Sequence, residues 1–183
     1  MPQGEVDSVK IKTMPYSYSK FKGEVADHIV STISRRDAIL DVGAGSGVYC
    51  DLLRGHFDRI DALEIFPAYV EMFKLRGKYS EVHIGDVREF DLNPYKYIIM
   101  GDVLEHLSYP DALSVLDRIN SSGKLVMVAV PYLYEQGTEF GNVHETHLQP
   151  DLTPEVMATR YPMLHLLYGD EQYGYYANYT TAD

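Results

Sequence analysis

The sequence has few of the residues that stabilise secreted proteins or anchor membrane proteins. It contains one cysteine, Cys50, and no tryptophan. A single cysteine excludes an internal disulfide and any zinc site made of several thiolates. No apolar run reaches the roughly 18 residues that cross a bilayer, and residues 1–15 lack the apolar stretch of a secretory signal. We therefore expect a cytoplasmic protein that does not bind membranes.

Basic side chains are also scarce. The 16 Lys and Arg residues are outnumbered by 27 Asp and Glu residues, which gives a net charge of −11. A negative field repels phosphate backbones, and the longest basic run, Arg35–Arg36, is too short to offset it. Nucleic acid is therefore disfavoured as a partner. A two-fold homodimer is the default expectation for self-association.

Apolar segments alternate with helical patterns along most of the chain. Strands are expected at 38–42, 59–65, 81–85, 95–100 and 125–130, and helices at 21–33, from Val48, at 67–76 and, capped by Asp111, through 112–119. After a loop at 132–150, a helix at 153–160 precedes a hairpin of strands 163–168 and 173–179. This order predicts an α/β fold, a doubly wound and mostly parallel sheet of about seven strands, closed by a C-terminal antiparallel hairpin.

The most informative segment is a glycine-rich turn. Gly43, Gly45 and Gly47 follow the strand that ends in Asp41–Val42 and precede a helix. Such a turn offers free backbone N–H groups and the positive end of a helix to a ligand. A dinucleotide site would place a third glycine at position 48, which is valine here. The spacing of the glycines therefore argues against a dinucleotide fingerprint.

This turn resembles motif I of the class I S-adenosylmethionine-dependent methyltransferases. Four further segments agree with that family in the same order: Glu64 after the second strand, Gly85–Val87 after the third, Tyr97–Leu107 with its Asp-Val-Leu-Glu-His sequence, and Asn120–Pro131. The resemblance covers about residues 35–180 and points to the small-molecule branch of the family. It implies a Rossmann-like fold in one methyltransferase domain over residues 21–183, preceded by an arm at residues 1–20.

The resemblance also implies which residues bind S-adenosylmethionine. The motif I residues would hold its methionine portion together with Gly101 and Asp102, Glu64 and Ile65 would hold the ribose, and Asp86 with Val87 would hold the adenine. The implied cofactor set is Asp41, Gly43, Ala44, Gly45, Gly47, Glu64, Ile65, Asp86, Val87, Gly101 and Asp102. The four acids of this set fall at expected carboxyl ends of strands, where open α/β sheets bind ligands. Carboxylates there suit a sulfonium cation with hydroxyl donors better than a pyrophosphate.

The acceptor of the methyl group should bind over the same strand ends. Glu105, His106 and His147 are the candidate catalytic residues, because a histidine near neutrality can act as a base and the loop at 132–150 can cover the site. The expected function is methyl transfer to a small molecule or metabolite, with no metal assigned.

Three alternatives remain open at this point. Glu105, His106, His144 and His147 together resemble the metal site of small-RNA 3′-end 2′-O-methyltransferases, although Asp102 stands where those enzymes have a glutamate. A protein side chain is another conceivable acceptor. A third hypothesis is a scaffold subunit that binds S-adenosylmethionine without turnover.

Overall fold

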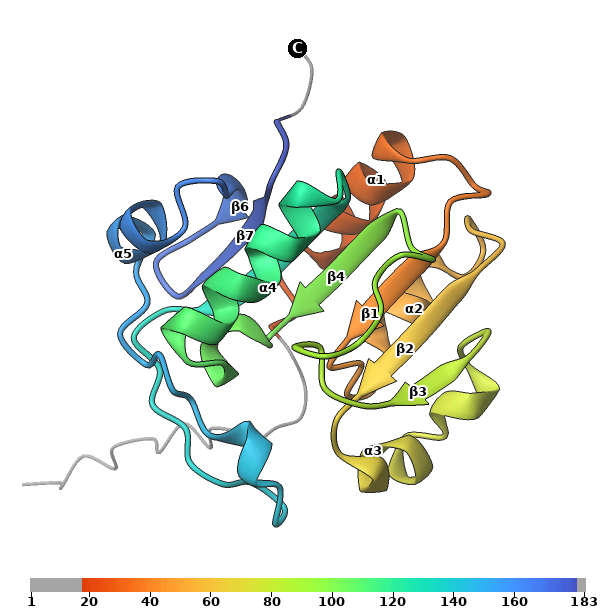
Figure 1. Ribbon diagram of the computed structural model, residues 1–183, viewed down its shortest axis with the longest axis horizontal. Coiled ribbons are helices and arrows are strands. Elements are labelled where there is room, and N and C mark those ends of the chain that lie inside the picture. Colours follow the sequence, from red (N-terminus) through yellow and green to blue (C-terminus); the bar gives the residue numbers. More distant parts are fainter. Residues whose placement is uncertain (1–17, 181–183) are drawn as a thin grey trace, which may run out of the picture.

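The structure is a computed structural model that describes residues 18–180. Most of the expected N-terminal arm, residues 1–17, lies outside the described residues. Seven strands form one sheet in the order β3-β2-β1-β4-β5-β7-β6 (Figure 1). Their bounds are β1 Ile39–Val42, β2 Ile60–Glu64, β3 Val82–Ile84, β4 Tyr97–Gly101, β5 Leu125–Pro131, β6 His165–Gly169 and β7 Tyr173–Ala177.

Strands β1 to β5 run parallel, and β7 and β6 add an antiparallel hairpin beyond β5. The central strands β1, β2, β4 and β5 are buried along nearly their whole length because both faces of the sheet are covered, and most of their residues are apolar, with Asp41, Asp61 and Glu64 as the buried acids. Figure 1 shows α1 and α2 behind the sheet and α4 in front of it. The predicted doubly wound α/β fold with a terminal antiparallel hairpin is therefore confirmed.

Five α-helices and three 3₁₀ turns occupy the described chain: α1 Lys22–Thr32, α2 Val48–Leu53, α3 Pro67–Met72, α4 Tyr109–Ser121 and α5 Pro154–Arg160, with η1 Leu75–Gly77, η2 Leu104–His106 and η3 Val143–Glu145. Alternate residues of each buried strand face opposite layers. In β4, Tyr97 and Ile99 belong to the cluster under α1 and α2, whereas Ile98 and Met100 pack with α4. This two-sided packing fixes the register of the sheet.

The start of α4 differs from the prediction. Asp111 was expected to cap the helix, but the N-cap is Ser108, whose hydroxyl accepts a hydrogen bond from the Asp111 backbone N–H at 3.3 Å. Asp111 lies in the first turn, where a negative charge interacts favourably with the helix dipole. Helix α4 therefore begins three residues closer to the η2 turn.

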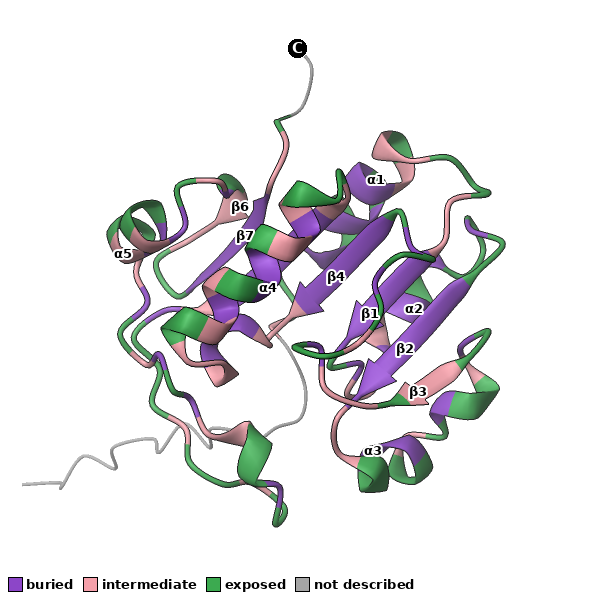
Figure 2. Ribbon diagram, in the orientation of Figure 1, coloured by how far each residue is buried: buried purple, intermediate pink, exposed green. Residues whose placement is uncertain are grey.

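The long segment after β5 was expected to be a loop and contains one 3₁₀ turn, η3. It passes the carboxyl ends of the parallel strands (Figure 1), and the backbone N–H groups of Leu148 and Gln149 donate to the Glu105 carbonyl at 2.8 and 3.0 Å. Figure 2 shows much of it exposed, in contrast to the buried sheet. The segment is therefore tied to η2 near its end, and its exposed residues alternate with buried ones such as Tyr132 and Asn142. Among residues 18–180 no helix is long and apolar enough to cross a membrane.

Candidate active site

A cavity of about 730 Å³ opens at the carboxyl ends of the parallel strands. One part of its wall is formed by the glycine turn and the ends of β2, β3 and β4. The other part is formed by η2, α4 and the segment after β5. Of the residues predicted to bind cofactor, nine line it: Gly43, Ala44, Gly45, Glu64, Ile65, Asp86, Val87, Gly101 and Asp102. Glu105, His106 and His147 line it as well.

The glycine turn lies close to neighbouring side chains. Gly43 has a φ of 63°, and a Cβ atom there would lie 2.5 Å from a methyl carbon of Val103. At Gly101 a Cβ atom would overlap the ring of Tyr49. Larger residues at these two positions would displace the wall, so the close packing requires glycine and leaves backbone exposed to a ligand.

Glu64 ends β2 and is only 3% exposed. Its carboxylate accepts hydrogen bonds from the backbone N–H of Phe66 at 2.9 Å and of Gly45 at 3.3 Å. Burial raises the pKa of this carboxyl group, and the two backbone donors oppose that shift. Glu64 therefore links the glycine turn to β2 and places carboxylate oxygens at the cavity surface.

Asp41 and Gly47 do not line the cavity. Asp41 is buried beneath the turn, where the Tyr79 hydroxyl donates to its carboxylate at 2.5 Å. Burial raises the pKa of Asp41 to about 7, and the Tyr79 hydrogen bond opposes that shift. Gly47 is the N-cap of α2 with a φ of 79°. Both residues support the turn from behind in this structure.

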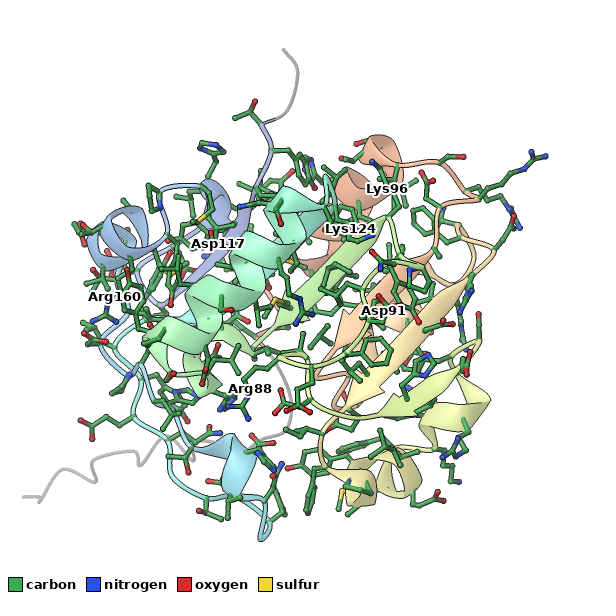
Figure 3. The ribbon with its side chains drawn as sticks, in the orientation of Figure 1. Arg88, Asp91, Lys96, Asp117, Lys124 and Arg160 are labelled. Carbon is green, nitrogen blue, oxygen red and sulfur yellow. The ribbon has the colours of Figure 1, made fainter. Side chains whose placement is uncertain are left out.

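Asp86 follows β3 and forms an ion pair with Arg88 at 2.5 Å. The Arg88 guanidinium holds the pKa of Asp86 below its usual value. Arg88 also reaches Asp111 at 3.1 Å and lies beside the first turn of α4 (Figure 3). This arrangement fixes the cavity wall beyond β3.

Glu105 is the least solvated acid of the cavity, at 1% exposure. Within residues 18–180, neither of its carboxylate oxygens accepts a hydrogen bond. Burial raises the pKa of this group well above its usual value, and Asp102 adds to the shift. A buried carboxyl group without a partner is energetically costly, so it is a strong candidate for contact with a ligand.

His106 and His147 lie next to Glu105, and their ring centroids are 4.7 Å apart. His147 Nδ1 lies 2.7 Å from the Tyr134 carbonyl, and His106 Nδ1 lies 3.3 Å from the Thr146 carbonyl. Because a carbonyl only accepts, Nδ1 carries the proton in each ring, and Nε2 is left with a lone pair. Burial lowers the pKa of each imidazole to about 4, so both are neutral near pH 7.

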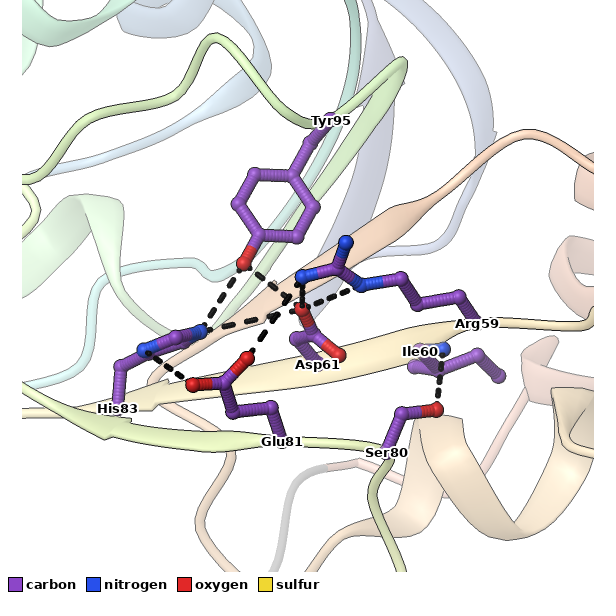
Figure 4. Close-up of polar contacts among 7 residues, drawn as sticks. All are labelled: Arg59, Ile60, Asp61, Ser80, Glu81, His83 and Tyr95. Atoms are coloured by element: carbon purple, nitrogen blue, oxygen red, sulfur yellow. Dashed lines mark hydrogen bonds and ion pairs between the residues drawn. The ribbon is translucent and has the colours of Figure 1, made fainter.

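Glu105, His106 and His147 also offer ligand atoms within 4.8 Å of one another, as metal ligands do. A second such group, Asp61, Glu81 and His83, lies near the amino ends of β2 and β3 (Figure 4). There Arg59 already donates to Asp61 at 2.6 Å, and its charge opposes the binding of a cation. The second group is therefore an internal ion-pair network away from the cavity.

Sequence reasoning missed several residues of this wall, among them Tyr49, Arg88 and Tyr69. Tyr49 is the second residue of α2, and its position directly after the glycine turn is the signal that would have placed it at the cavity. Arg88 lies two residues beyond Asp86, within reach of it. No sequence pattern identified Tyr69, which α3 brings to the cavity.

Comparisons with known proteins agree with this architecture. A family model described as a methyltransferase domain matches residues 15–152. Over 70 residues the chain is 31% identical to a dTDP-4-amino-2,3,4,6-tetradeoxy-D-glucose N,N-dimethyltransferase from Saccharopolyspora spinosa. The match covers 38% of this chain and spans 28% of that enzyme's length.

Solved structures share the fold at low identity. An S-adenosylmethionine-dependent methyltransferase from Clostridium acetobutylicum superimposes with a TM-score of 0.61 at 10% identity, covering 85% of this chain and 88% of the other. The small RNA methyltransferase HEN1 superimposes with a TM-score of 0.62 at 18% identity, covering 91% of this chain but 26% of that longer protein. At these identities the superpositions show the fold alone.

Proposed function

This chain belongs to the class I S-adenosylmethionine-dependent methyltransferases, and we propose that it transfers the methyl group to a small-molecule acceptor bound beside Glu105, His106 and His147. The main observation in support of this proposal is the continuous cavity of about 730 Å³, which runs from the glycine turn to these residues. Pockets for ligands of drug size measure about 300–1,000 Å³. The volume therefore suits a cofactor together with a modest acceptor.

The cofactor end is assigned from the donors and acceptors on its wall. Glu64 would accept from the ribose hydroxyls, and Gly43, Ala44 and Gly45 would lie along the methionine portion. Asp86 and Val87 would contact the adenine, with Ile65 beside the ribose and Gly101 and Asp102 beside the methionine. Asp41 and Gly47 would act indirectly by holding the turn. The close glycine packing leaves the backbone accessible, as this assignment requires.

The bound cofactor supplies a methyl group already activated by its positive sulfur. What remains for the protein is to align the acceptor and to keep it deprotonated. Holding two reactants in line can lower a barrier by about 7–11 kcal/mol. The neutral His106 and His147 each leave an Nε2 lone pair as a proton acceptor, and Glu105 can balance positive charge on an amine or on a protonated imidazole.

Relatives with small acceptors support this proposal. The matched Saccharopolyspora enzyme is named for N,N-dimethylation of an amino sugar nucleotide. An amine acceptor suits a cavity whose wall carries several carboxyl groups, among them Glu64, Glu105 and Glu145. Arg88 is paired with both Asp86 and Asp111, so the wall offers little unpaired positive charge that would repel an amine.

A substitution at Glu64 tests the cofactor assignment. In Glu64→Ala, S-adenosylhomocysteine should bind about 1–3 kcal/mol more weakly by calorimetry, because charged hydrogen bonds to the ribose are lost. Glu71→Ala, an exposed glutamate of α3, is the matched control and should bind like the wild type. Equal affinity in all three proteins contradicts the ribose assignment.

A labelling experiment tests the acceptor class. S-adenosylmethionine with a tritiated methyl group is incubated with amino sugars and small amines, with single-stranded RNA and with a protein extract, each with and without chelator. Label in a small molecule supports the proposal. Label confined to RNA or protein contradicts it, and cofactor binding without any labelled product favours the scaffold hypothesis.

The cluster of Glu105, His106 and His147 favours a second candidate, metal-assisted methylation of an RNA 3′ end. Its ligand atoms lie within 4.8 Å of one another, and its two imidazoles are neutral. HEN1 shares the fold. Labelling of RNA that is abolished by chelator and restored by a divalent cation would support this candidate. Labelling of RNA that is indifferent to chelator would exclude the metal from it.

A further inference from the structure

The cavity wall has little positive charge to offer an anion. Among its described lining residues, Arg88 is the only lysine or arginine, and its guanidinium is paired with Asp86 and Asp111. S-adenosylmethionine carries a carboxylate on its methionine portion. A carboxylate that enters a largely buried site needs a cation or several donors to replace water. The wall beside Gly43 and Gly101 provides neither lysine nor arginine.

Lys22 lies directly behind that part of the wall. Its side chain is buried, with the residue only 6% exposed, and its Nζ lies 4.1 Å from the centre of the Tyr49 ring. Tyr49 itself lines the cavity and packs on Gly101. The carboxyl groups of Asp102 and Asp41 are the charges that act on the Lys22 ammonium. One aromatic ring therefore lies between the ammonium group and the cavity.

The Lys22 ammonium has no hydrogen-bond partner within residues 18–180. Other lysines differ from it, because Lys20 is paired with Asp170 at 2.8 Å and Lys78 with Asp51 at 2.6 Å. Lys22 is also the first residue of α1, where the helix dipole disfavours a cation. Burial and this position both destabilise the charged form, so the residue is poorly explained by stability alone.

We propose that Lys22 binds the α-carboxylate of the methionine portion of S-adenosylmethionine. The flexible four-carbon side chain lets the ammonium move past the edge of Tyr49, and the carboxylate then provides the partner that it lacks. The inference rests on the proposed placement of the methionine portion beside Gly43 and Gly101. It adds a binding residue that lies outside the glycine turn and 21 residues before its first glycine, Gly43.

Three ligands that differ in one group each test this role. S-adenosylhomocysteine has both the α-amino and the α-carboxylate group, S-adenosyl-3-thiopropylamine lacks only the carboxylate, and 5′-methylthioadenosine lacks both. Calorimetry measures each affinity for the wild type, for Lys22→Met and for the matched control Lys20→Met. In the wild type, loss of the carboxylate should weaken binding about tenfold or more.

In Lys22→Met, the affinity for S-adenosylhomocysteine should fall by the same factor. The affinities for the other two ligands should stay within about twofold of their wild-type values. Lys20→Met should retain the wild-type pattern. Equal weakening of all three ligands in Lys22→Met would assign the lysine to packing of the wall and overturn the proposal. The wild type alone is decisive if the variant does not fold, because equal binding of S-adenosylhomocysteine and S-adenosyl-3-thiopropylamine also overturns it.

The assay separates this inference from the cofactor assignment on which it rests. If the placement of the cofactor is wrong, Glu64→Ala leaves 5′-methylthioadenosine binding unchanged. If only the role of Lys22 is wrong, Glu64→Ala still weakens 5′-methylthioadenosine, whereas Lys22→Met does not discriminate among the three ligands.

Discussion

Two carboxyl groups are buried at opposite ends of the parallel strands: one oxygen of Asp61 accepts hydrogen bonds, whereas neither oxygen of Glu105 does so among the described residues. Asp61 of β2 is fully buried and receives donors from Arg59 at 2.6 Å and from Tyr95 at 2.9 Å, with His83 at 3.8 Å (Figure 4). Glu105, after β4, is equally buried, and its carboxylate oxygens accept no hydrogen bond from the described residues. Arg59 of the same chain therefore balances the charge of Asp61, whereas Glu105 remains available to a ligand.

The contrast separates two reasons for burying a charge. An acid with its counter-charge in the same chain fixes the packing of neighbouring strands, and removing one member leaves the other unpaired. A buried acid without a counter-charge lowers the stability of the folded protein. In return, the site has a carboxyl group that can contact a ligand cation. The difference predicts opposite responses to isosteric substitution.

The largest expected effect is at Glu105. Glu105→Gln keeps the shape of the side chain but cannot become negatively charged, so methyl transfer should fall about 100-fold or more. Thermal stability should stay close to that of the wild type, because the amide replaces one buried polar group without a partner by another of the same shape. Steady-state rates and a melting curve measure both. An active Glu105→Gln variant would break the comparison, since both acids would then be structural.

A smaller effect is expected at Asp61, in stability rather than in activity. Asp61→Asn should lower the free energy of unfolding by about 2–3 kcal/mol, because Arg59 loses its buried partner. Tyr95→Phe, which removes one neutral donor to the same carboxylate, should cost about 1 kcal/mol. Urea unfolding gives both values. Affinity for S-adenosylhomocysteine should not change, and a large loss of affinity would contradict the assignment of this network to packing.

Asp41 is intermediate between Asp61 and Glu105, because it is buried and accepts one side-chain hydrogen bond, from Tyr79. Burial raises its pKa to about 7, above the value of about 4 in an unfolded chain. Its contribution to stability is therefore complete below pH 4 and is lost as the pH rises through 7. Asp41→Asn does not titrate, so relative to the wild type it should gain about 2 kcal/mol between pH 5 and pH 7.

Urea unfolding at those two pH values checks this prediction. Asp27→Asn, an exposed acid of α1, is the control and should follow the wild type at both. A constant difference between Asp41→Asn and the wild type would show that Asp41 is ionised throughout this range.

The parts predicted correctly from sequence are those that a local pattern determines. The apolar strands and the glycine turn depend on neighbouring residues alone, so the α/β sheet was predicted, and nine of the eleven residues expected to bind cofactor line the cavity. The N-cap of α4 was misassigned because Ser108 and Asp111 are both typical capping residues, and only the backbone conformation distinguishes them.

Contacts that depend on register were not predictable. The Asp61 network joins β2 to residues of β3 and of the segment before β4, and its members are typical exposed polar residues in the sequence. The burial of Lys22 was not predictable either, because in the sequence this lysine is typical of the exposed polar residues at the start of a helix. Its burial follows from the packing of α1 against α2 and from Tyr49, which the sequence does not specify.

The hairpin at β6 and β7 also holds the start of α1. The Tyr175 hydroxyl donates to the Lys20 carbonyl at 2.9 Å across 155 residues of chain, and Tyr18 stacks on Tyr173 at 5.0 Å. Tyr18 and Tyr173 both line the cavity. On the ribosome, this wall is incomplete until residues near 175 have emerged, although the glycine turn is made more than 120 residues earlier. Cofactor can therefore assist the final step of folding, while the earlier intermediates must remain soluble without it.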